Sequence, residues 1–239
     1  MVWTHADMQQ WWQDDLPCES VVLLEVDSTS AWLKQQRPEK ATLVVAYSQT
    51  AGYGQQGRSW GMRPGRDLVF SLWLPDASGI EDFATLTPWL AFQLRAALQP
   101  LSEDALTCKW PNDLYNPAGK VSGTLVERQG RGLIVGTGIN WLRTQHHPYA
   151  LAKEHLPEHW LADWTAFLLH KLPTYQRGQW LNVQPQWAAV DWFRQDEAVV
   201  DQCGRRWTYV GVDELGRICL QQQGERHCFA TGKISLKRV

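Results

Sequence analysis

Residues 50–60 read TAGYGQQGRSW, and their glycines have the G-x-G-x-x-G spacing of dinucleotide-binding loops. In those loops the glycines follow a strand and open a helix within a βαβ unit. Here the loop does follow a predicted strand, since residues 42–47 (TLVVAY) are short and rich in β-branched side chains. It does not open a helix, because two further glycines and a proline come next. Residues 67–74 (DLVFSLWL) then predict another strand, so the loop joins two strands and a Rossmann fold is excluded.

The composition predicts a globular protein without a nucleic-acid or membrane partner. The 239 residues are 44% hydrophobic and 20% charged, enough for one large domain or for one large and one small. A net charge of −2 argues against a nucleic-acid-binding surface. The sequence has no apolar run that approaches a membrane span, and its first 15 residues are too polar for a signal peptide.

The first three quarters of the chain mix predicted strands with predicted helices. We predict strands over residues 23–26, 42–47, 67–74, 106–110, 120–128 and 132–141, and helices over 31–36, 81–98 and 164–175. Because Pro88 lies inside the second helix, a start near Thr87 is an alternative for it. Residues 144–160 are expected to form a long connection.

After Pro185 the pattern changes to short strands alone. These are expected over residues 198–201, 206–212, 217–222 and 226–229. Several short strands without a helix predict a small barrel. We therefore divide the chain into a first domain over 1–185 and a second over 186–239.

The cysteines predict a reduced, cytoplasmic protein without a metal centre. There are five, an odd number, and none of them shows C-x-x-C spacing. Thiols of this kind are typical of proteins in a reducing compartment.

Four motifs carry the candidate chemistry, although each has a structural explanation when taken alone. Residues 27–29 (DST) could cap a helix, Lys109 could be a solvated strand-end lysine, and Gly136 and Gly138 could mark a bulge. The glycine loop is the fourth motif. Taken together, they resemble the catalytic domain of the biotin protein ligases, also called biotin–[acetyl-CoA-carboxylase] ligases. The phrase KWPNDL at 109–114, followed by a turn and GKVSGTLVE, is especially specific to that family.

The resemblance is strong from about Glu25 to Asn140 and weaker at residues 232–236 (GKISL). It implies an α+β fold, in which a mixed sheet with packed helices like that of class II aminoacyl-tRNA synthetases precedes a small SH3-like barrel. It also implies that biotin and ATP, with Mg²⁺, give biotinyl-5′-AMP. Biotin would then pass to a lysine of the biotin carboxyl carrier domain of acetyl-CoA carboxylase. A homodimer is possible. Because about 22 residues precede the first predicted strand, we expect the short type without a DNA-binding domain.

The resemblance also assigns the candidate site residues. Fixed cations would offset the repulsion between the biotin carboxylate and the α-phosphate, and Lys109 and Arg58 match family positions for this. The biotin-binding candidates are Ser28, Thr29, Ser30, Gln49, Gly52, Tyr53, Gly54, Gln55 and Lys109. The ATP-binding candidates are Gly57, Arg58, Trp60, Asn112, Lys120 and Asn140. No residue is assigned to a metal.

The glycine loop departs from the family pattern G-R-G-R-R-G-R. Tyr53, Gln55 and Gln56 stand where that pattern has arginine, and only Arg58 remains. A loss of positive charge beside two anions should weaken retention of the adenylate. The alternative is that Arg63 or Arg66 replaces the missing charge from downstream.

Three other functions remain open. A degenerate relative could bind biotin or its adenylate without efficient transfer, and the altered loop favours that. A lipoate or octanoate ligase of the same superfamily would have a related fold. A structural module without a small ligand would leave the loop and Lys109 unexplained.

Overall fold

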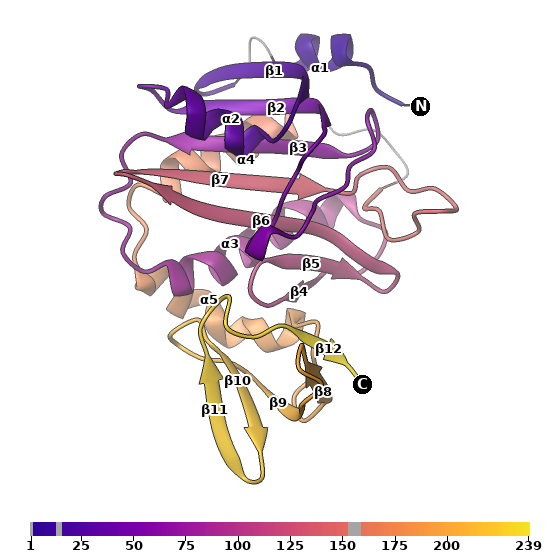
Figure 1. Cartoon of the computed structure of the whole chain (residues 1–239), viewed down its shortest axis with the longest axis vertical. Helices are drawn as coiled ribbons and strands as arrows, with labels where there is room; N and C mark the ends of the chain where they lie inside the picture. Colours follow the sequence, from indigo (N-terminus) through magenta and orange to yellow (C-terminus); the bar gives the residue numbers. More distant parts are fainter. Residues whose placement is uncertain (1, 13–15, 153–158) are drawn as a thin grey trace.

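The computed structural model describes residues 2–12, 16–152 and 159–239, and a seven-stranded sheet forms its larger part (Figure 1). In chain order its strands are β1 (Glu19–Val26), β2 (Thr42–Gln49), β3 (Leu68–Leu74), β4 (Thr107–Lys109), β5 (Asp113–Asn116), β6 (Gly119–Gln129) and β7 (Gly132–Ile139). They lie side by side in the order β1-β2-β3-β7-β6-β5-β4. β1 and β2 are parallel and the other neighbours antiparallel, so the predicted mixed sheet is confirmed.

Helices cover both faces of this sheet, because its central strands are apolar on both sides. On one face, Leu33 of α2 (Thr29–Gln36) packs on Val44, Trp73 and Ile134. The next residues along the strands, such as Val45, face the larger core on the other side. α3 (Phe83–Leu98) and α4 (Trp160–Lys171) supply that core, and Figure 1 shows α2 in front of the strands and α4 behind them.

A second, antiparallel sheet follows α5 (Arg177–Val190). Its strands are β8 (Ala198–Asp201), β9 (Arg206–Val212), β10 (Ile218–Gln222), β11 (Glu225–Phe229) and β12 (Leu236–Arg238), in the order β11-β10-β9-β8-β12. The predicted small β domain is therefore present. The sequence patterns did not reveal α5, and residue 185, at our division of the chain, lies inside this helix.

Several local predictions need correction. α3 begins at Phe83, where Asp82 accepts a hydrogen bond from Thr85 N at 3.2 Å, so the alternative start near Thr87 is wrong. α1 (His5–Trp12), β5 and β12 were not predicted. The connection expected over 144–160 lies partly outside the described residues, at 153–158. None of the described helices is long and apolar enough to cross a membrane.

The prediction that all five cysteines are reduced is wrong. Cys219 and Cys228 form a disulfide, while Cys18, Cys108 and Cys203 are free. The reason is strand register, because Cys219 on β10 lies directly opposite Cys228 on β11 and their Cα atoms are 4.2 Å apart. The spacing of the cysteines in the sequence did not show that they would pair across a hairpin.

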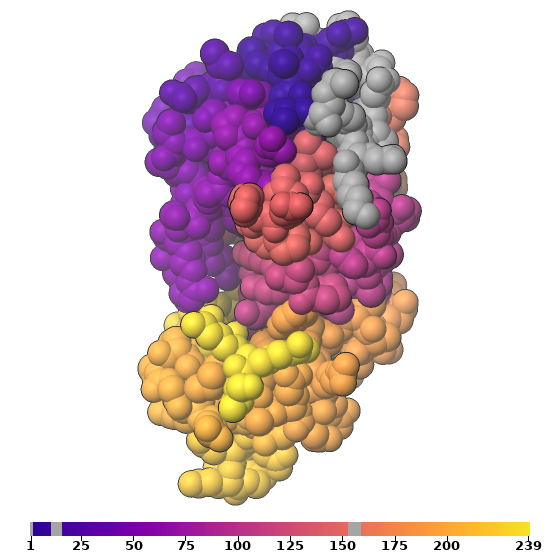
Figure 2. All heavy atoms as spheres, turned by 90° about the vertical axis from the view of Figure 1, so that its right-hand side faces the viewer, coloured from indigo at the N-terminus to yellow at the C-terminus, as the bar shows by residue number. Residues whose placement is uncertain are grey.

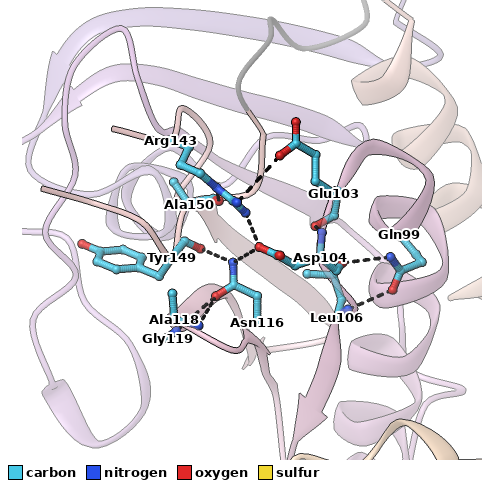
Figure 3. A network of polar contacts seen from close by, with 11 residues as sticks. Gln99, Glu103, Asp104, Leu106, Asn116, Ala118, Gly119, Arg143, Tyr149 and Ala150 are labelled. Carbon is cyan, nitrogen blue, oxygen red and sulfur yellow. Dashed lines mark hydrogen bonds and ion pairs between the residues drawn. The ribbon is translucent and has the colours of Figure 1, made fainter. Parts of the chain in front are cut away.

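A polar network fixes the connection after β7 against the turn between β5 and β6 (Figure 3). The buried Asn116 donates to the Tyr149 carbonyl at 3.0 Å, and Arg143 donates to Asp104. Asn116 Oδ1 also accepts from the backbone N–H groups of Ala118 and Gly119, at 3.0 and 3.1 Å. The turn that leads to Lys120 is therefore held from several sides.

Candidate active site

A cavity opens on the face of the large sheet that α2 covers. The start of α2, the glycine loop, β3, the β5–β6 hairpin and β7 all contribute to its walls. Its lining residues are Ser28, Thr29, Ser30, Gln49, Tyr53, Gly54, Gln55, Arg58, Ser59, Trp60, Val69, Phe70, Ser71, Asn112, Asp113, Lys120, Gly123, Thr124, Leu125, Gly136, Thr137 and Gly138. All four motifs singled out in the sequence thus lie at or beside one cavity.

Neutral hydroxyl and amide groups line one end of the cavity. Ser28 caps α2, because its side chain accepts from Ala31 N at 3.4 Å. Thr29 Oγ1 lies 2.7 Å from Ser71 Oγ and 3.2 Å from Gln49 Oε1, and its backbone N–H also donates to Gln49 Oε1 at 2.8 Å. This arrangement can hold a neutral polar ligand and offers no charge at this end.

The glycine loop lies over the cavity as a narrow turn. Gly54 N donates to Arg58 O at 2.7 Å and Trp60 N to Gly52 O at 2.8 Å, and Tyr53 is bridged to Ser59. A short 3₁₀ turn, η1 (Gln55–Gly57), forms the tip. The loop joins β2 to β3, as predicted.

The glycines of β7 provide room for neighbouring side chains. A Cβ atom at Gly138 would lie 2.4 Å from the Trp60 ring, and one at Gly136 would lie 2.7 Å from Ser30 Oγ. Both residues pair in regular register with β3 and β6, so the bulge explanation does not apply. Without side chains at these positions, Trp60 and Ser30 can approach the floor of the cavity.

The β5–β6 hairpin brings a charged pair to the cavity. Lys120 Nζ lies 2.7 Å from Asp113 Oδ1 and 5.2 Å from the centre of the Trp60 ring. Asn140 supports this lysine from behind, since its Nδ2 donates to Lys120 O at 2.9 Å. Asn112 is nearly buried and donates to Thr124 O at 2.6 Å.

Some buried polar atoms of the cavity lining have no hydrogen-bond partner within the described part of the protein. They are Trp60 Nε1, whose ring lies over Gly138, and Thr124 Oγ1 and Thr137 Oγ1, which belong to paired residues whose side chains face the α3 side of the sheet with Phe70. Such groups are costly when unpaired, and they are found at sites where a ligand or water completes the bonding. The Trp60 indole N–H can therefore donate to a polar ligand in the cavity.

Lys109 lines a second cavity that shares Gln55, Arg58, Asn112 and Asp113 with the first. The segment 232–236 forms its opposite wall. The Lys109 ammonium lies 5.0 Å from the centre of the Tyr115 ring, and among the described residues it forms no ion pair. Burial lowers its pKa; Asp113 opposes this, and the cations Lys120, Arg58 and Lys237 lower it further.

The predicted site residues fall into two groups. Most line the first cavity, whereas Gly52, Gly57, Lys109 and Asn140 lie beside it in the described structure. Sequence reasoning missed Ser71, Asp113, Gly123, Thr124 and Thr137. Asp113 lies in KWPNDL, and the other three besides Ser71 lie in GKVSGTLVE or between Gly136 and Gly138, so those phrases could have pointed to them. Nothing in the strand patterns marked Ser71.

Downstream arginines do not replace the missing loop charges. Arg63 is committed to Asp67, to which its Nε donates at 2.9 Å, and neither Arg63 nor Arg66 is among the residues that line either cavity. Lys34 of α2 instead reaches the loop, where its Nζ lies 2.9 Å from the Tyr53 hydroxyl.

The sequence profile of the biotin/lipoate A/B protein ligase family matches residues 23–142. The chain belongs to this family. Among curated members, the bifunctional ligase/repressor BirA of Salmonella typhimurium is 26% identical over 90% of this chain and 73% of its own length. The biotin–[acetyl-CoA-carboxylase] ligase of Paracoccus denitrificans is 35% identical over 50% of this chain and 53% of its own.

Solved structures of the biotin/lipoate ligase family share the fold. The biotin protein ligase from Aquifex aeolicus, in complex with biotin and ATP, superposes with a TM-score of 0.77. It is 27% identical, and the match covers 92% of this chain and 99% of that one.

Proposed function

We propose that this protein is a biotin protein ligase that activates biotin with ATP and transfers it to a lysine of a carrier domain. The observation that carries the proposal is the convergence of the glycine loop, the start of α2 and the KWPNDL hairpin on two adjoining cavities. The Paracoccus relative and the Aquifex structure bear biotin ligase names, which favours biotin over lipoate or octanoate.

The lining of the first cavity suits the two substrates. The hydroxyl and amide groups of Ser28, Thr29 and Gln49 can pair with the neutral ureido ring of biotin. The nucleotide would lie toward Trp60 and Lys120, where the indole N–H has no partner among the described residues. Support for this division comes from the chemistry of the lining and from the family pattern.

In the first step, a biotin carboxylate oxygen attacks the α-phosphorus and the bond to the β-phosphate breaks, so that pyrophosphate leaves. Lys109 and Arg58 carry positive charge at the junction of the two cavities, where these anions would meet. Such fixed charge stabilises the transition state more than the separated substrates. In the second step, the carrier amine attacks the acyl carbon and AMP leaves.

The described residues around the first cavity do not form a cage of acidic ligands for Mg²⁺. Asp113 is the one carboxylate in its described lining, and Lys120 already pairs with it. Mg²⁺ in nucleotide sites is held largely by phosphates and water, with one or two carboxylates. Mg²⁺ would therefore arrive on the phosphates of ATP and neutralise part of their charge.

The test is transfer itself. Protein, biotin, ATP and Mg²⁺ are incubated with a biotin carboxyl carrier domain, and the carrier is analysed by mass spectrometry, with pyrophosphate followed separately. We expect one biotinyl group on one carrier lysine. Pyrophosphate release without carrier labelling would favour the degenerate relative, and neither product would contradict the proposal. Lipoate and octanoate in place of biotin serve as competing acids.

Four finer points belong to the same proposal. The carrier is the biotin carboxyl carrier domain of acetyl-CoA carboxylase, the enzyme that the Paracoccus relative is named for. A homodimer and a cytoplasmic location are expected from the family. So is a catalytic domain that binds biotin and ATP over residues 1–185, followed by a small SH3-like barrel over 186–239. The oligomeric state can be measured by light scattering with and without biotin and ATP.

A further inference from the structure

The side chain that replaces the first loop arginine is held by a closed cluster of polar contacts. The Tyr53 hydroxyl accepts from Lys34 Nζ at 2.9 Å and donates to Glu127 Oε2 at 3.2 Å. Lys34 Nζ also lies 2.7 Å from Glu127 Oε1. The three residues come from α2, the glycine loop and β6, so the cluster connects three separate walls of the first cavity.

The cluster is partly withdrawn from water, which makes its contacts stronger than those of a surface ion pair. The side chains of Lys34 and Glu127 are 31% and 22% exposed, and the ammonium lies 5.2 Å from the centre of the Tyr53 ring. Burial opposes the charge on Lys34, yet its hydrogen bonds to Glu127 and Tyr53 raise the pKa of that ammonium above its ordinary value. Charge-assisted hydrogen bonds of this kind are stronger than neutral ones.

Tyr53 is well placed to control the loop. It is the residue bridged to Ser59 on the returning side of the turn. Farther along, Gln56 Nε2 donates to the Gly232 carbonyl at 2.9 Å, so the tip is also attached to the C-terminal segment. In Figure 2 the segment between β2 and β3 runs down beside the sheet and meets the C-terminal segment, with a hollow behind it. All of these contacts are made between residues of the protein itself.

We propose that Lys34, Tyr53 and Glu127 act as positioning residues that hold the glycine loop closed over the cavity before any substrate binds. Arginines on the loop would order it by contacting the bound ligand. Here, contacts within the protein supply part of that order. A loop that is already ordered loses less conformational entropy when the ligand binds. Opening it requires breaking the cluster, and a bound intermediate can leave only through the open form.

The direct test is limited proteolysis of the ligand-free protein with trypsin, scored by mass spectrometry at the Arg58–Ser59 bond. Cleavage of a closed loop reports the fraction of molecules in which it is open. We expect Lys34→Met and Tyr53→Phe each to speed this cleavage by about three- to tenfold, since each removes one or two charge-assisted contacts. Lys34→Arg, which keeps a donor cation, should restore cleavage close to the parent rate.

Lys40→Met is the matched control. Lys40 pairs with Glu19 at 2.8 Å on the open surface, with side chains 76% and 54% exposed, so the variant removes the same charge from α2's neighbourhood without touching the loop. Its cleavage at Arg58 should equal that of the parent. Equal cleavage of Lys34→Met, Tyr53→Phe and the parent, with all melting temperatures alike, would overturn the proposal.

A second readout rests on the proposed function. Enzyme loaded with biotinyl-5′-AMP is separated from free nucleotide, and loss of the adenylate is followed over time. Lys34→Met should release the adenylate faster than the parent does, by the same factor by which trypsin cleaves its loop faster. Lys34→Arg should release the adenylate at the parent rate. If no variant and no parent forms adenylate, the proposed function fails, but the proteolysis result still decides the role of the cluster.

Discussion

The Lys109 ammonium is largely buried beside the Tyr115 ring, and Asp113 only partly offsets the effect of this burial and of three nearby cations, which together lower its pKa. Lys109→Ala should therefore leave the fold intact and slow adenylate formation by about 10²–10³. Pyrophosphate release with biotin and ATP measures this, and thermal unfolding checks the fold. Lys40→Ala, an exposed lysine outside both cavities, is the control. Parent-like turnover of Lys109→Ala would show that the family assignment of this lysine does not hold.

Gln55 lines both cavities at a position where the family pattern has arginine. A neutral partner on a phosphate is roughly half as strong as a charged one, so the parent should lose adenylate to solution. Released adenylate labels lysines on bystander proteins, and Gln55→Arg should reduce this labelling by about three- to tenfold.

Labelling of a bystander protein in the presence of biotin and ATP measures how much adenylate the parent, with Gln55, releases to solution. Gln35→Arg, an added charge on an exposed part of α2, should leave the labelling unchanged. No labelling by the parent, together with no change in Gln55→Arg, would show that the loop retains the adenylate without that arginine.

The sequence was sufficient to predict those site residues that belong to a recognisable motif. Ser28, Gln49 and Lys120 are examples, because each lies in or beside a family phrase and lines the cavity. The role of Lys34 could not be predicted from the sequence. Its partner Glu127 is 93 residues away, and an exposed-looking lysine on a short helix has no local signal that points to a tyrosine in a loop.

At the scale of elements, the β10–β11 hairpin carries the disulfide that the cysteine count argued against. Alkylation under denaturing, non-reducing conditions should find three free thiols, Cys18, Cys108 and Cys203, and five after reduction. On a chain-entropy estimate for a loop of this length, reduction should lower the stability of the C-terminal sheet by about 2–3 kcal/mol. Five reactive thiols before reduction would contradict the pairing.

Element types were predictable where periodicity is strong and failed where it is not. The strand–loop–strand order around the glycine loop follows from two apolar runs, and both became strands. α5 was missed because Pro185 lies inside it and polar residues separate its two buried tryptophans, Trp180 and Trp187. Side-chain contacts stabilise that helix, since Trp187 donates to Asp191 at 2.7 Å and packs edge-on against Trp180.

At the scale of the whole molecule, Asp191 joins the two sheets. It follows α5, is bridged to Cys108 of β4, and accepts hydrogen bonds from Tyr209 of β9 and from Trp187. Burial raises its pKa to about 7, against the hydrogen bonds from Tyr209, Phe193 and Trp187, which lower it. In the unfolded chain an aspartate titrates near pH 4. The folded protein therefore holds an extra proton between about pH 4 and 7.

Because the folded state binds that proton, stability should fall as the pH rises from about 4 to 7 and change little from this group above that. The loss is on the order of 4 kcal/mol at most. Asp191→Asn, which cannot ionise, should flatten the dependence, as measured by urea unfolding at pH 5, 6, 7 and 8. Asp163→Asn, at an exposed position on α4, should keep the parent slope. An unchanged slope in Asp191→Asn would show that another group is responsible.

The contact between Lys34 and Tyr53 also limits which side chains the loop can carry at position 53. A change of Tyr53 to arginine would place a guanidinium beside the Lys34 ammonium, and both would compete for the single Glu127 carboxylate. Tyr53→Arg alone should then open the loop, whereas the same change in a Lys34→Met background should close it again, a sign reversal that a double-mutant cycle detects. The effects of substitutions at these two positions should therefore depend on one another and not simply add.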